Sequence, residues 1–249
     1  MPDVMVITGS SRGIGAATAR LAAKAGYAVC VNYLHNAKAA GEVVDDIVSA
    51  GGEAIAVHGD MSVEADIIRL FRTVDQDLGR LAVLVNNAGT VGDAPVRVQD
   101  ITSDRLQSML ALNVAGYFLC AREAIRRMST AQGGQGGAII NISSAAARLG
   151  SPGEYVDYAA SKGAIDTMTI GLAKEVAGEG IRVNAVRPGL IRTDIHASGG
   201  QPDRLSRLEK AVPMQRIGTP EEVAETVLWL AGPSASYITG ALVDVSGGR

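Results

Sequence analysis

Tyr158 and Lys162 are the residues whose types and spacing most clearly suggest chemistry in this chain. They lie four positions apart in a stretch whose pattern predicts a helix, so both side chains should leave the same helix face, one turn apart. A phenol has a pKa of about 10 and is a poor acid–base catalyst at neutral pH. A nearby ammonium favours the phenolate and brings the phenol pKa toward the working range. Such a pair is common on helices, so a catalytic interpretation needs support from the rest of the chain.

The elements that would position this pair follow a regular alternation of short apolar runs and longer amphipathic segments. This alternation predicts an α/β protein with a Rossmann fold, a doubly wound parallel sheet of about seven strands with helices on both faces. The expected strands are 4–7, 28–32, 54–58, 83–86, 138–142, 182–186 and 242–245. The expected helices are 13–25, 37–50, 63–78, 103–129, 156–178 and 220–231. No linker divides the chain, so we expect a single domain over residues 1–249.

Composition argues against several classes of function. The net charge is −3 with no basic block, so nucleic acid is not an expected partner. No apolar run approaches the roughly 18 residues of a membrane span, so no membrane association is expected. Two distant cysteines and three histidines give no support to a disulfide framework or a metal site. The chain enters its first strand without a signal peptide, which together with the cysteine usage predicts a cytoplasmic protein.

The turn after the first expected strand is rich in glycine. Residues 8–15 read Thr-Gly-Ser-Ser-Arg-Gly-Ile-Gly and precede a helix-forming run. Glycine permits a tight turn and close approach to a pyrophosphate, and the helix adds free N–H groups and the positive end of its dipole. Sharp turns also use glycine, but the position after the first strand favours dinucleotide binding. The expected cofactor contacts in this turn are Gly9, Ser11, Arg12, Gly13, Ile14 and Gly15.

The end of the second expected strand bears on the choice between NAD(H) and NADP(H). Many NAD sites carry a carboxylate there for the ribose 2′-hydroxyl, whereas this chain has Asn32 and Tyr33. Arg12, within the glycine turn, could reach a 2′-phosphate. We therefore expect NADP(H), with NAD(H) as the less favoured cofactor and a solvent-facing Arg12 as the alternative.

Taken together, these motifs resemble the short-chain dehydrogenase/reductase family in its compact form of roughly 250 residues. The resemblance covers essentially the whole chain and includes subgroups such as 3-oxoacyl-carrier-protein reductases and sugar or polyol dehydrogenases. The motifs that carry it are Thr8-Gly9-x-x-x-Gly13-x-Gly15, Asp60, Asn86-Asn87-Ala88-Gly89, Asn113, Ser144, Tyr158-x-x-x-Lys162 and Pro188-Gly189-x-Ile191-x-Thr193.

The resemblance implies a role for each catalytic candidate. Tyr158 would be the general acid–base, and Lys162 would lower its pKa and bind the nicotinamide ribose. Ser144 would donate a hydrogen bond to the substrate oxygen. Asn113 would help to hold a water of a proton relay. Further cofactor contacts implied by the family pattern are Asp60, Met61, Asn87, Ala88, Gly89, Pro188, Gly189, Ile191 and Thr193.

Two details of the pattern need a choice. Ser143 and Ser144 follow one another at a strand end and should point to opposite faces, and the family's serine usually corresponds to the second of such a pair. Ser144 and Tyr158 are 14 positions apart, one more than the commonest family spacing of about 13, which suggests a one-residue insertion. Tyr155 is a rival phenol without a lysine four residues on, and we expect it to line the pocket or pack.

The function expected from these residues is NADP(H)-dependent interconversion of a carbonyl and an alcohol on a small-molecule substrate. Enoyl reductases of the family tend to space Tyr and Lys more widely, which favours carbonyl chemistry here. A catalytically silent NADP(H)-sensing module is the alternative, and a purely structural oligomer subunit is less favoured.

Two further expectations concern the loop after the sixth strand and the assembly. Residues 190–213 are expected to form a substrate lid with Leu205, Leu208 and Val212 as its closing apolar face, on the basis of the glycines and prolines there. The loop residues Arg192, His196, Arg204 and Arg207 are expected at the surface, with no substrate role. The family resemblance implies a homotetramer, with residues such as Met109, Val114, Phe118 and Met168 on the pairing helices.

Overall fold

The protein is described by a computed structural model that covers residues 2–93, 95–195 and 199–249. Its centre is one sheet of seven strands, all parallel, in the order β3-β2-β1-β4-β5-β6-β7. The strands are β1 (Val4–Ile7), β2 (Ala28–Tyr33), β3 (Ala54–His58), β4 (Leu81–Asn86), β5 (Gly137–Ile142), β6 (Ile181–Pro188) and β7 (Leu242–Val245). The predicted seven-stranded, doubly wound sheet in a single domain is confirmed.

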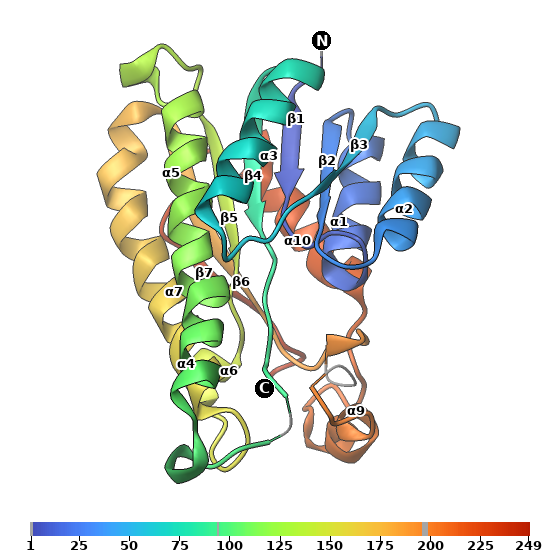
Figure 1. Ribbon diagram of the computed structural model, residues 1–249, viewed down its shortest axis with the longest axis vertical. Helices are drawn as coiled ribbons and strands as arrows, with labels where there is room; N and C mark the ends of the chain where they lie inside the picture. The colour runs from blue at the N-terminus through green and yellow to red at the C-terminus, as the bar shows by residue number, and fades with distance from the viewer. Residues whose placement is uncertain (1, 94, 196–198) are drawn as a thin grey trace.

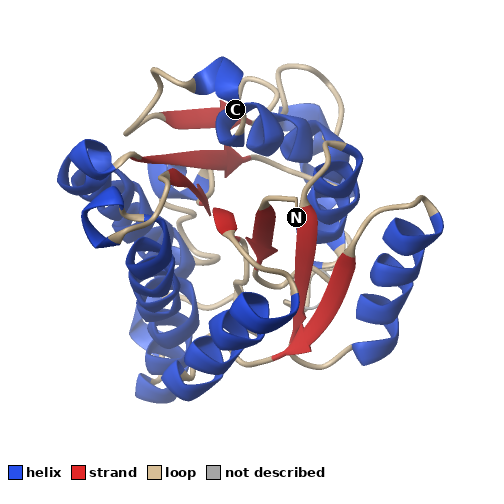
Figure 2. Ribbon diagram, turned by 90° about the horizontal axis from the view of Figure 1, so that it is seen from above, coloured by secondary structure: helices blue, strands red, loops and turns tan. Residues whose placement is uncertain are grey.

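Helices cover both faces of this sheet (Figures 1 and 2). In Figure 1, α5 and α7 stand to the left of the sheet and α1 and α2 to the right. The helices are α1 (Gly13–Lys24), α2 (Ala37–Ser49), α3 (Glu64–Asp77), α4 (Ser103–Leu110), α5 (Gly116–Met128), α6 (Ala146–Leu149), α7 (Val156–Val176), α9 (Arg204–Leu208) and α10 (Pro220–Ala231). Single 3₁₀ turns occupy Val98–Asp100, Thr130–Gln132, Ala177–Glu179, Glu209–Ala211 and Pro233–Ala235.

The alternation of side chains along each strand divides the core into two halves. Val4 and Val6 of β1 pack with α3, α5 and α7, whereas Met5 and Ile7 pack with α1, α2 and α10. All four side chains are fully buried. A strand that is covered on both faces must be apolar throughout, which is why β1 reads as an unbroken apolar run.

The strand order places a crevice where the functional motifs meet. From β1 the chain adds β2 and β3 on one side and then returns to place β4 on the other side of β1. Loops that leave the carboxyl ends of β1 and β4 therefore run in opposite directions, and ligands of doubly wound sheets bind at such a point. The glycine turn follows β1, and residues 87–89 follow β4, so both flank the same crevice.

The expected single helix over 103–129 differs in the structure. It is divided into α4, a π-helical turn over Ala111–Ala115, and α5. Such π turns are often found at functional sites, and this one contains Asn113. Periodicity alone does not reveal it because an added residue shifts the pattern by only part of a turn.

The apolar residues proposed for helix pairing also need correction. Met109 and Met168 are 1% and 6% exposed and pack inside this chain, so neither is available to a second subunit. The large apolar side chains that α4, α5 and α7 expose are Leu106, Leu110, Phe118 and Ile170, of which Phe118 is 52% exposed. Among the described helices, none is both long and apolar enough to cross a membrane.

Candidate active site

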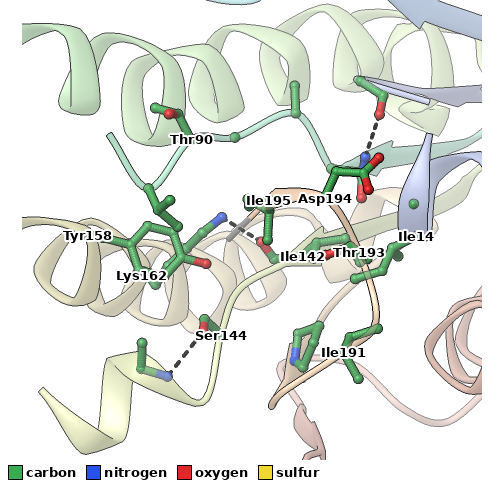
Figure 3. A pocket seen from close by; sticks show the side chains of 18 of the residues that line it. Ile14, Thr90, Ile142, Ser144, Tyr158, Lys162, Ile191, Thr193, Asp194 and Ile195 are labelled. Atoms are coloured by element: carbon green, nitrogen blue, oxygen red, sulfur yellow. Dashed lines mark hydrogen bonds between the residues drawn. The ribbon is translucent and has the colours of Figure 1, made fainter. Parts of the chain in front are cut away.

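A cavity of about 1000 Å³ opens at the carboxyl ends of the strands. Its walls come from the turn after β1, the ends of β2, β4, β5 and β6, the first turns of α7, and the loop before α9. Figure 3 shows Tyr158 and Ser144 on one side of this cavity and Ile14, Ile191 and Thr193 on the other. All but two of the residues expected from the sequence to form the site line it: Asn113 is packed behind the wall, and Gly15 lies just beneath the glycine turn.

Gly9 and Gly15 make the glycine turn possible. Gly9 has φ +62°, a backbone conformation that other residues rarely adopt, and a Cβ there would lie 2.9 Å from the Cα of Ala88. A Cβ on Gly15 would lie 2.7 Å from Nδ2 of Asn87 and from the Cα of Ser10. Any larger side chain at either position would push the turn away from the end of β4.

Asn32 supports this turn from behind. Its Oδ1 accepts a hydrogen bond from the Gly9 amide at 2.9 Å, and its Nδ2 donates to the carbonyls of Val57 and Gly59 at 3.3 and 3.0 Å. The side chain is 1% exposed. Asn32 therefore ties β2, β3 and the glycine turn together and positions the turn, in addition to lining the cavity.

Thr8 and Asn87 join the ends of β1 and β4. The Thr8 hydroxyl accepts hydrogen bonds from the amides of Asn87 and Ala88 at 2.9 and 3.0 Å. Nδ2 of Asn87 donates to the carbonyls of Thr8 and Gly9 at 2.8 and 2.9 Å. These four bonds hold the floor of the crevice at a fixed width.

The end of the cavity beside β2 has a positive bias. Arg12 is exposed, and its guanidinium has no hydrogen-bond or ion-pair partner among the described residues. Tyr33 lies beside it in the cavity wall, and its ring meets that of His58 edge to face at 5.6 Å between centroids. From Gly9 to Asn36, the cavity wall contains no Asp or Glu among the described residues. His35 and Asn36 also line this end, and neither was predicted from the sequence because both look like ordinary loop residues.

Asp60 and Met61 lie after β3 in the same wall. Oδ1 of Asp60 accepts hydrogen bonds from the amide and hydroxyl of Ser62 at 2.8 and 2.7 Å. Within the described chain, Oδ2 has no partner. Asp60 thus stabilises the turn before α3 and keeps one oxygen available to a ligand.

Tyr158 and Ser144 face the cavity together (Figure 3). Burial is the largest influence on the Tyr158 phenol and raises its pKa above the ordinary value, while a hydrogen bond with Ser144 and the charge of Arg204 lower it. The expectation that Lys162 brings the phenol pKa down is therefore not met in the polypeptide alone. The physical reason is desolvation of the phenol, which therefore carries its proton at neutral pH.

Lys162 is held behind Tyr158 by a residue that sequence reasoning missed. Its Nζ donates hydrogen bonds to the Ile142 carbonyl at 2.8 Å and to the Tyr117 hydroxyl at 3.1 Å. The ammonium lies 4.8 Å from the centroid of the Tyr117 ring and 5.8 Å from that of Tyr158. Burial lowers the pKa of Lys162 to about 7, so the ammonium and amine forms are similarly populated at neutral pH.

Tyr117 completes this arrangement. Its hydroxyl donates to the Ile142 carbonyl at 3.0 Å, so its remaining capacity is as an acceptor from Lys162. The side chain is 2% exposed, and burial raises the pKa of its phenol well above the ordinary value. In the sequence Tyr117 is one more large residue on an amphipathic helix, and no spacing links it to Lys162.

Asn113 is fully buried in the π turn. Its Oδ1 accepts from the Thr90 amide at 2.9 Å, and its Nδ2 donates to the Thr90 carbonyl at 2.8 Å and to the Ser161 hydroxyl at 3.1 Å. The side chain therefore fixes the loop after β4 against α7. The expected water relay stays a prediction.

Ser143 and Ser144 point to different sides, as their adjacency on the chain requires. The Ser143 hydroxyl contacts the Lys162 carbonyl at 3.1 Å and Asp166 at 2.6 Å, away from the Tyr158 phenol. The Ser144 hydroxyl accepts from the Ala146 amide at 3.1 Å at the start of α6. Between Ser144 and Tyr158 the chain forms α6 and passes through Ser151, which has φ +44°. The one-residue insertion stays a prediction.

The loop after β6 begins in a fixed position. The Gly189 amide donates to the Val245 carbonyl at 3.0 Å, and Ile191 pairs with Gly218 in an isolated bridge. Pro188, Gly189, Ile191 and Thr193 all line the cavity. The root of the expected lid is therefore part of the sheet framework, and residues 196–198, including His196, lie outside the described residues.

Two expectations for this loop are wrong. Leu205 and Val212 do not form a free apolar face, because they pack with Leu190 and Ile217 in a small core of their own, whereas Leu208 packs against this core and also lines the cavity. Arg204 is not a surface residue, because it is only 8% exposed and lines the cavity. It forms an ion pair with Glu154, which precedes it by 50 residues, so no local sequence signal reveals the contact.

Comparison with known proteins agrees with this geometry. The family model described as Enoyl-(Acyl carrier protein) reductase matches residues 9–249. An uncharacterized oxidoreductase of Escherichia coli K12, YgfF, is 54% identical over 246 residues, covering 99% of each chain. A 3-oxoacyl-[acyl-carrier-protein] reductase of Synechocystis is 40% identical over 248 residues, covering 99% of this chain and 96% of that protein. A short-chain dehydrogenase from Burkholderia cenocepacia, solved in complex with NADP, superimposes with a TM-score of 0.91 at 30% identity, covering 99% of this chain and 97% of its own.

Proposed function

The chain belongs to the short-chain dehydrogenase/reductase family of oxidoreductases, and we propose that it interconverts a ketone or aldehyde and an alcohol with NADP(H) as cofactor. The observation that carries this proposal is the joint presence of Tyr158 and Ser144 in one cavity wall, with Lys162 directly behind. The substrate is a small molecule that enters between these residues and the loop before α9.

The shape of the cavity fits a dinucleotide. Gly9 and Gly15 leave no room for a Cβ, so the turn after β1 presents bare backbone to the crevice. A Cβ on Gly89 would approach Nζ of Lys162 to 3.6 Å, where the nicotinamide ribose would bind. These are the close approaches that a bound pyrophosphate and ribose require.

NADP(H) is favoured over NAD(H) by charge. Arg12 would pair with the 2′-phosphate, Tyr33 would line its site, and the cavity wall nearby offers no carboxylate to accept a ribose hydroxyl among the described residues. After the neighbouring strand β3, the free oxygen of Asp60 would accept from the adenine amino group. The solved relative from Burkholderia cenocepacia, which is in complex with NADP, supports the same choice.

The chain's own residues would act on the substrate oxygen. NADPH would supply the hydride when bound. The Tyr158 phenol, which burial keeps protonated, would donate its proton to the oxygen as negative charge develops there. The Ser144 hydroxyl would donate a second hydrogen bond to that oxygen, and Lys162 would bind the nicotinamide ribose and stabilise the phenolate that Tyr158 becomes. In the oxidation of an alcohol, each of these proton transfers would run in reverse.

Carbonyl chemistry is favoured over enoyl reduction, although the matching family model bears an enoyl reductase description. Tyr158 and Lys162 lie one helical turn apart, and the Ser144 hydroxyl lies beside the phenol to hold a carbonyl oxygen. A catalytically silent NADP(H) sensor would have no use for this arrangement. Turnover of a saturated ketone, measured beside an α,β-unsaturated acyl substrate, distinguishes these functions.

Cofactor titration and a substrate screen test the proposal together. We expect NADPH to bind more tightly than NADH and to support reduction of at least one ketone class. Equal or tighter binding of NADH would contradict the cofactor assignment. NADPH binding without turnover across ketone and alcohol panels would instead favour the sensing module.

The assembly and the loop remain proposals as well. We propose a homotetramer in which the exposed side chains Leu106, Leu110, Phe118 and Ile170 pair across a two-fold axis. A stable monomer in sedimentation at micromolar concentration would contradict it.

We also propose that residues 190–213 become more ordered when ligand binds, with the bridge between Ile191 and Gly218 as the fixed end of the loop. Hydrogen exchange that stays uniformly slow there without ligand would show a fixed wall.

A further inference from the structure

Arg204 is a buried cation in the substrate end of the cavity whose hydrogen-bonding capacity is only partly used. It is 8% exposed and lines the cavity together with Tyr155 and Tyr158. Its Nη1 pairs with Glu154. Nε is buried without a hydrogen-bond partner, and in the described part of the chain Nη2 has none either. Nε and Nη2 form one planar edge of the guanidinium, the fork that matches the two oxygens of a carboxylate.

The orientation of this guanidinium is fixed in advance. It stacks over the Tyr155 ring with 5.3 Å between Cζ and the ring centroid. Tyr155 is itself held, because its hydroxyl donates to the Gly199 carbonyl at 3.2 Å and accepts from Nε2 of Gln201 at 2.8 Å. Glu154 holds one end of the fork, and the ring fixes its plane. A ligand would therefore meet a preorganised edge and not a flexible side chain.

The charges around Arg204 leave this part of the cavity positive. Glu154 is shared between Arg204 and Arg207, whose Nη2 lies 3.4 Å from Oε1 of Glu154, so two cations face one anion. Asp194 also lines the cavity, but on the side where Thr193 and Ile14 lie (Figure 3). Arg204 and Tyr158 line the same cavity, and the charge of Arg204 lowers the pKa of the phenol. The two groups are therefore within electrostatic reach of one another.

We infer that the substrate is an oxo acid, a ketone or aldehyde that carries a carboxylate, and that the Nε–Nη2 edge of Arg204 binds this carboxylate while Tyr158 and Ser144 hold the carbonyl oxygen. This inference rests on the proposed carbonyl reduction. A buried guanidinium N–H without an acceptor is costly, and a carboxylate would satisfy it with two charge-assisted hydrogen bonds. A neutral ester of the same skeleton would lose the ionic part of this interaction.

The test compares 2-oxo and 4-oxo carboxylates with their own methyl esters, using NADPH and the full-length protein. The quantity measured is the ratio of kcat/KM for each acid to that for its ester. We expect the wild-type ratio to exceed one by about 10-fold to 150-fold, the range for a hydrogen-bonded charged group. Arg204→Gln should bring the ratio close to one. Arg204→Lys, which keeps the charge without the fork, should give an intermediate ratio.

Lys210→Gln is the matched control. It removes one positive charge just after the same short helix, but Lys210 is exposed, does not line the cavity and does not contact Glu154 or Gln201. Its ratio should stay within about threefold of the wild-type value, since an exposed charge contributes little. An equal loss of the ratio in Lys210→Gln would overturn direct recognition by Arg204.

The wild-type protein alone also decides the inference, whether or not the variants fold. If esters are reduced as well as or better than the acids, the oxo acid assignment fails and the carbonyl reductase proposal stands. If neither acids, esters nor other ketones are reduced although NADPH binds, both fail.

Discussion

Replacing Tyr117 by Phe should lower the pKa of Lys162, and so the fraction of Lys162 that is charged, without removing any contact with the substrate. The substitution keeps the ring, which lies 4.8 Å from the ammonium, and removes the hydroxyl that accepts from Nζ at 3.1 Å. That hydroxyl stabilises the ammonium form because its own proton is already donated to the Ile142 carbonyl. Its removal should therefore favour the neutral amine.

The size of this effect follows from the hydrogen bond. A hydrogen bond to a charged group contributes about 1.5–3 kcal/mol, which corresponds to a decrease of about 1 to 2 in the pKa of Lys162. The pKa starts at about 7, so roughly half of the wild-type side chains are charged at pH 7. In the variant, the charged fraction at pH 7 should fall to about 1–10%.

The assay is NMR titration of Lys162 Nζ, beside the pH dependence of kcat/KM for ketone reduction. We expect the acid–base transition of Nζ, and any limb of the rate profile that it controls, to move to lower pH by the same amount. Tyr237→Phe, the same chemical change at a fully exposed position, is the control and should leave both unchanged. An unchanged Nζ titration in Tyr117→Phe would refute the reasoning that the Tyr117 hydroxyl stabilises the ammonium form of Lys162.

Two further predictions concern stability and cofactor choice. Lys162→Met should abolish turnover and raise the free energy of unfolding at pH 7 by on the order of 1–3 kcal/mol. The pKa of Lys162 falls from 10.5 to about 7 on folding, so between these pH values the unfolded wild-type chain binds more protons than the folded one, and wild-type stability rises with pH. The advantage of the variant in denaturant titrations should therefore vanish near pH 10. Arg12→Gln should weaken NADPH binding by about 10-fold to 150-fold and NADH binding by less than about threefold, as measured by fluorescence titration. The control is Arg20→Gln, on the helix that follows Arg12, because Arg20 is paired with Asp46 outside the cavity. Equal losses for both cofactors in Arg12→Gln would exclude a 2′-phosphate contact.

The sheet was predictable from sequence because its signals are local. Each strand from β1 to β7 is an apolar run bounded by turn residues, and β1, β3 and β7 agree with the structure to the residue. The glycine turn was equally visible, because its spacing and its place after β1 both carry information. The π turn around Asn113 was not, because one extra residue per turn barely disturbs the apolar pattern.

The parts of the site that sequence did not predict depend on distant contacts. Tyr117 meets Lys162 across 45 positions, and Arg204 meets Glu154 across 50. Nothing near Arg204 distinguishes it from Arg207, yet one is buried and the other is exposed. The expected lowering of the Tyr158 pKa by Lys162 is not met in the polypeptide alone, because burial of the phenol, which only the packed structure reveals, raises this pKa.

Single-turnover reduction of a ketone by NADPH-loaded Tyr158→Phe, beside the wild-type protein, tests the central claim most directly. The phenylalanine keeps the ring and removes only the proton that the substrate oxygen should receive. We predict that the NADPH dissociation constant changes by less than about threefold, while the rate of nicotinamide oxidation falls by about 10²-fold to 10⁴-fold, the usual contribution of a general acid. A near-normal rate in Tyr158→Phe would contradict the assignment of Tyr158 as the proton donor.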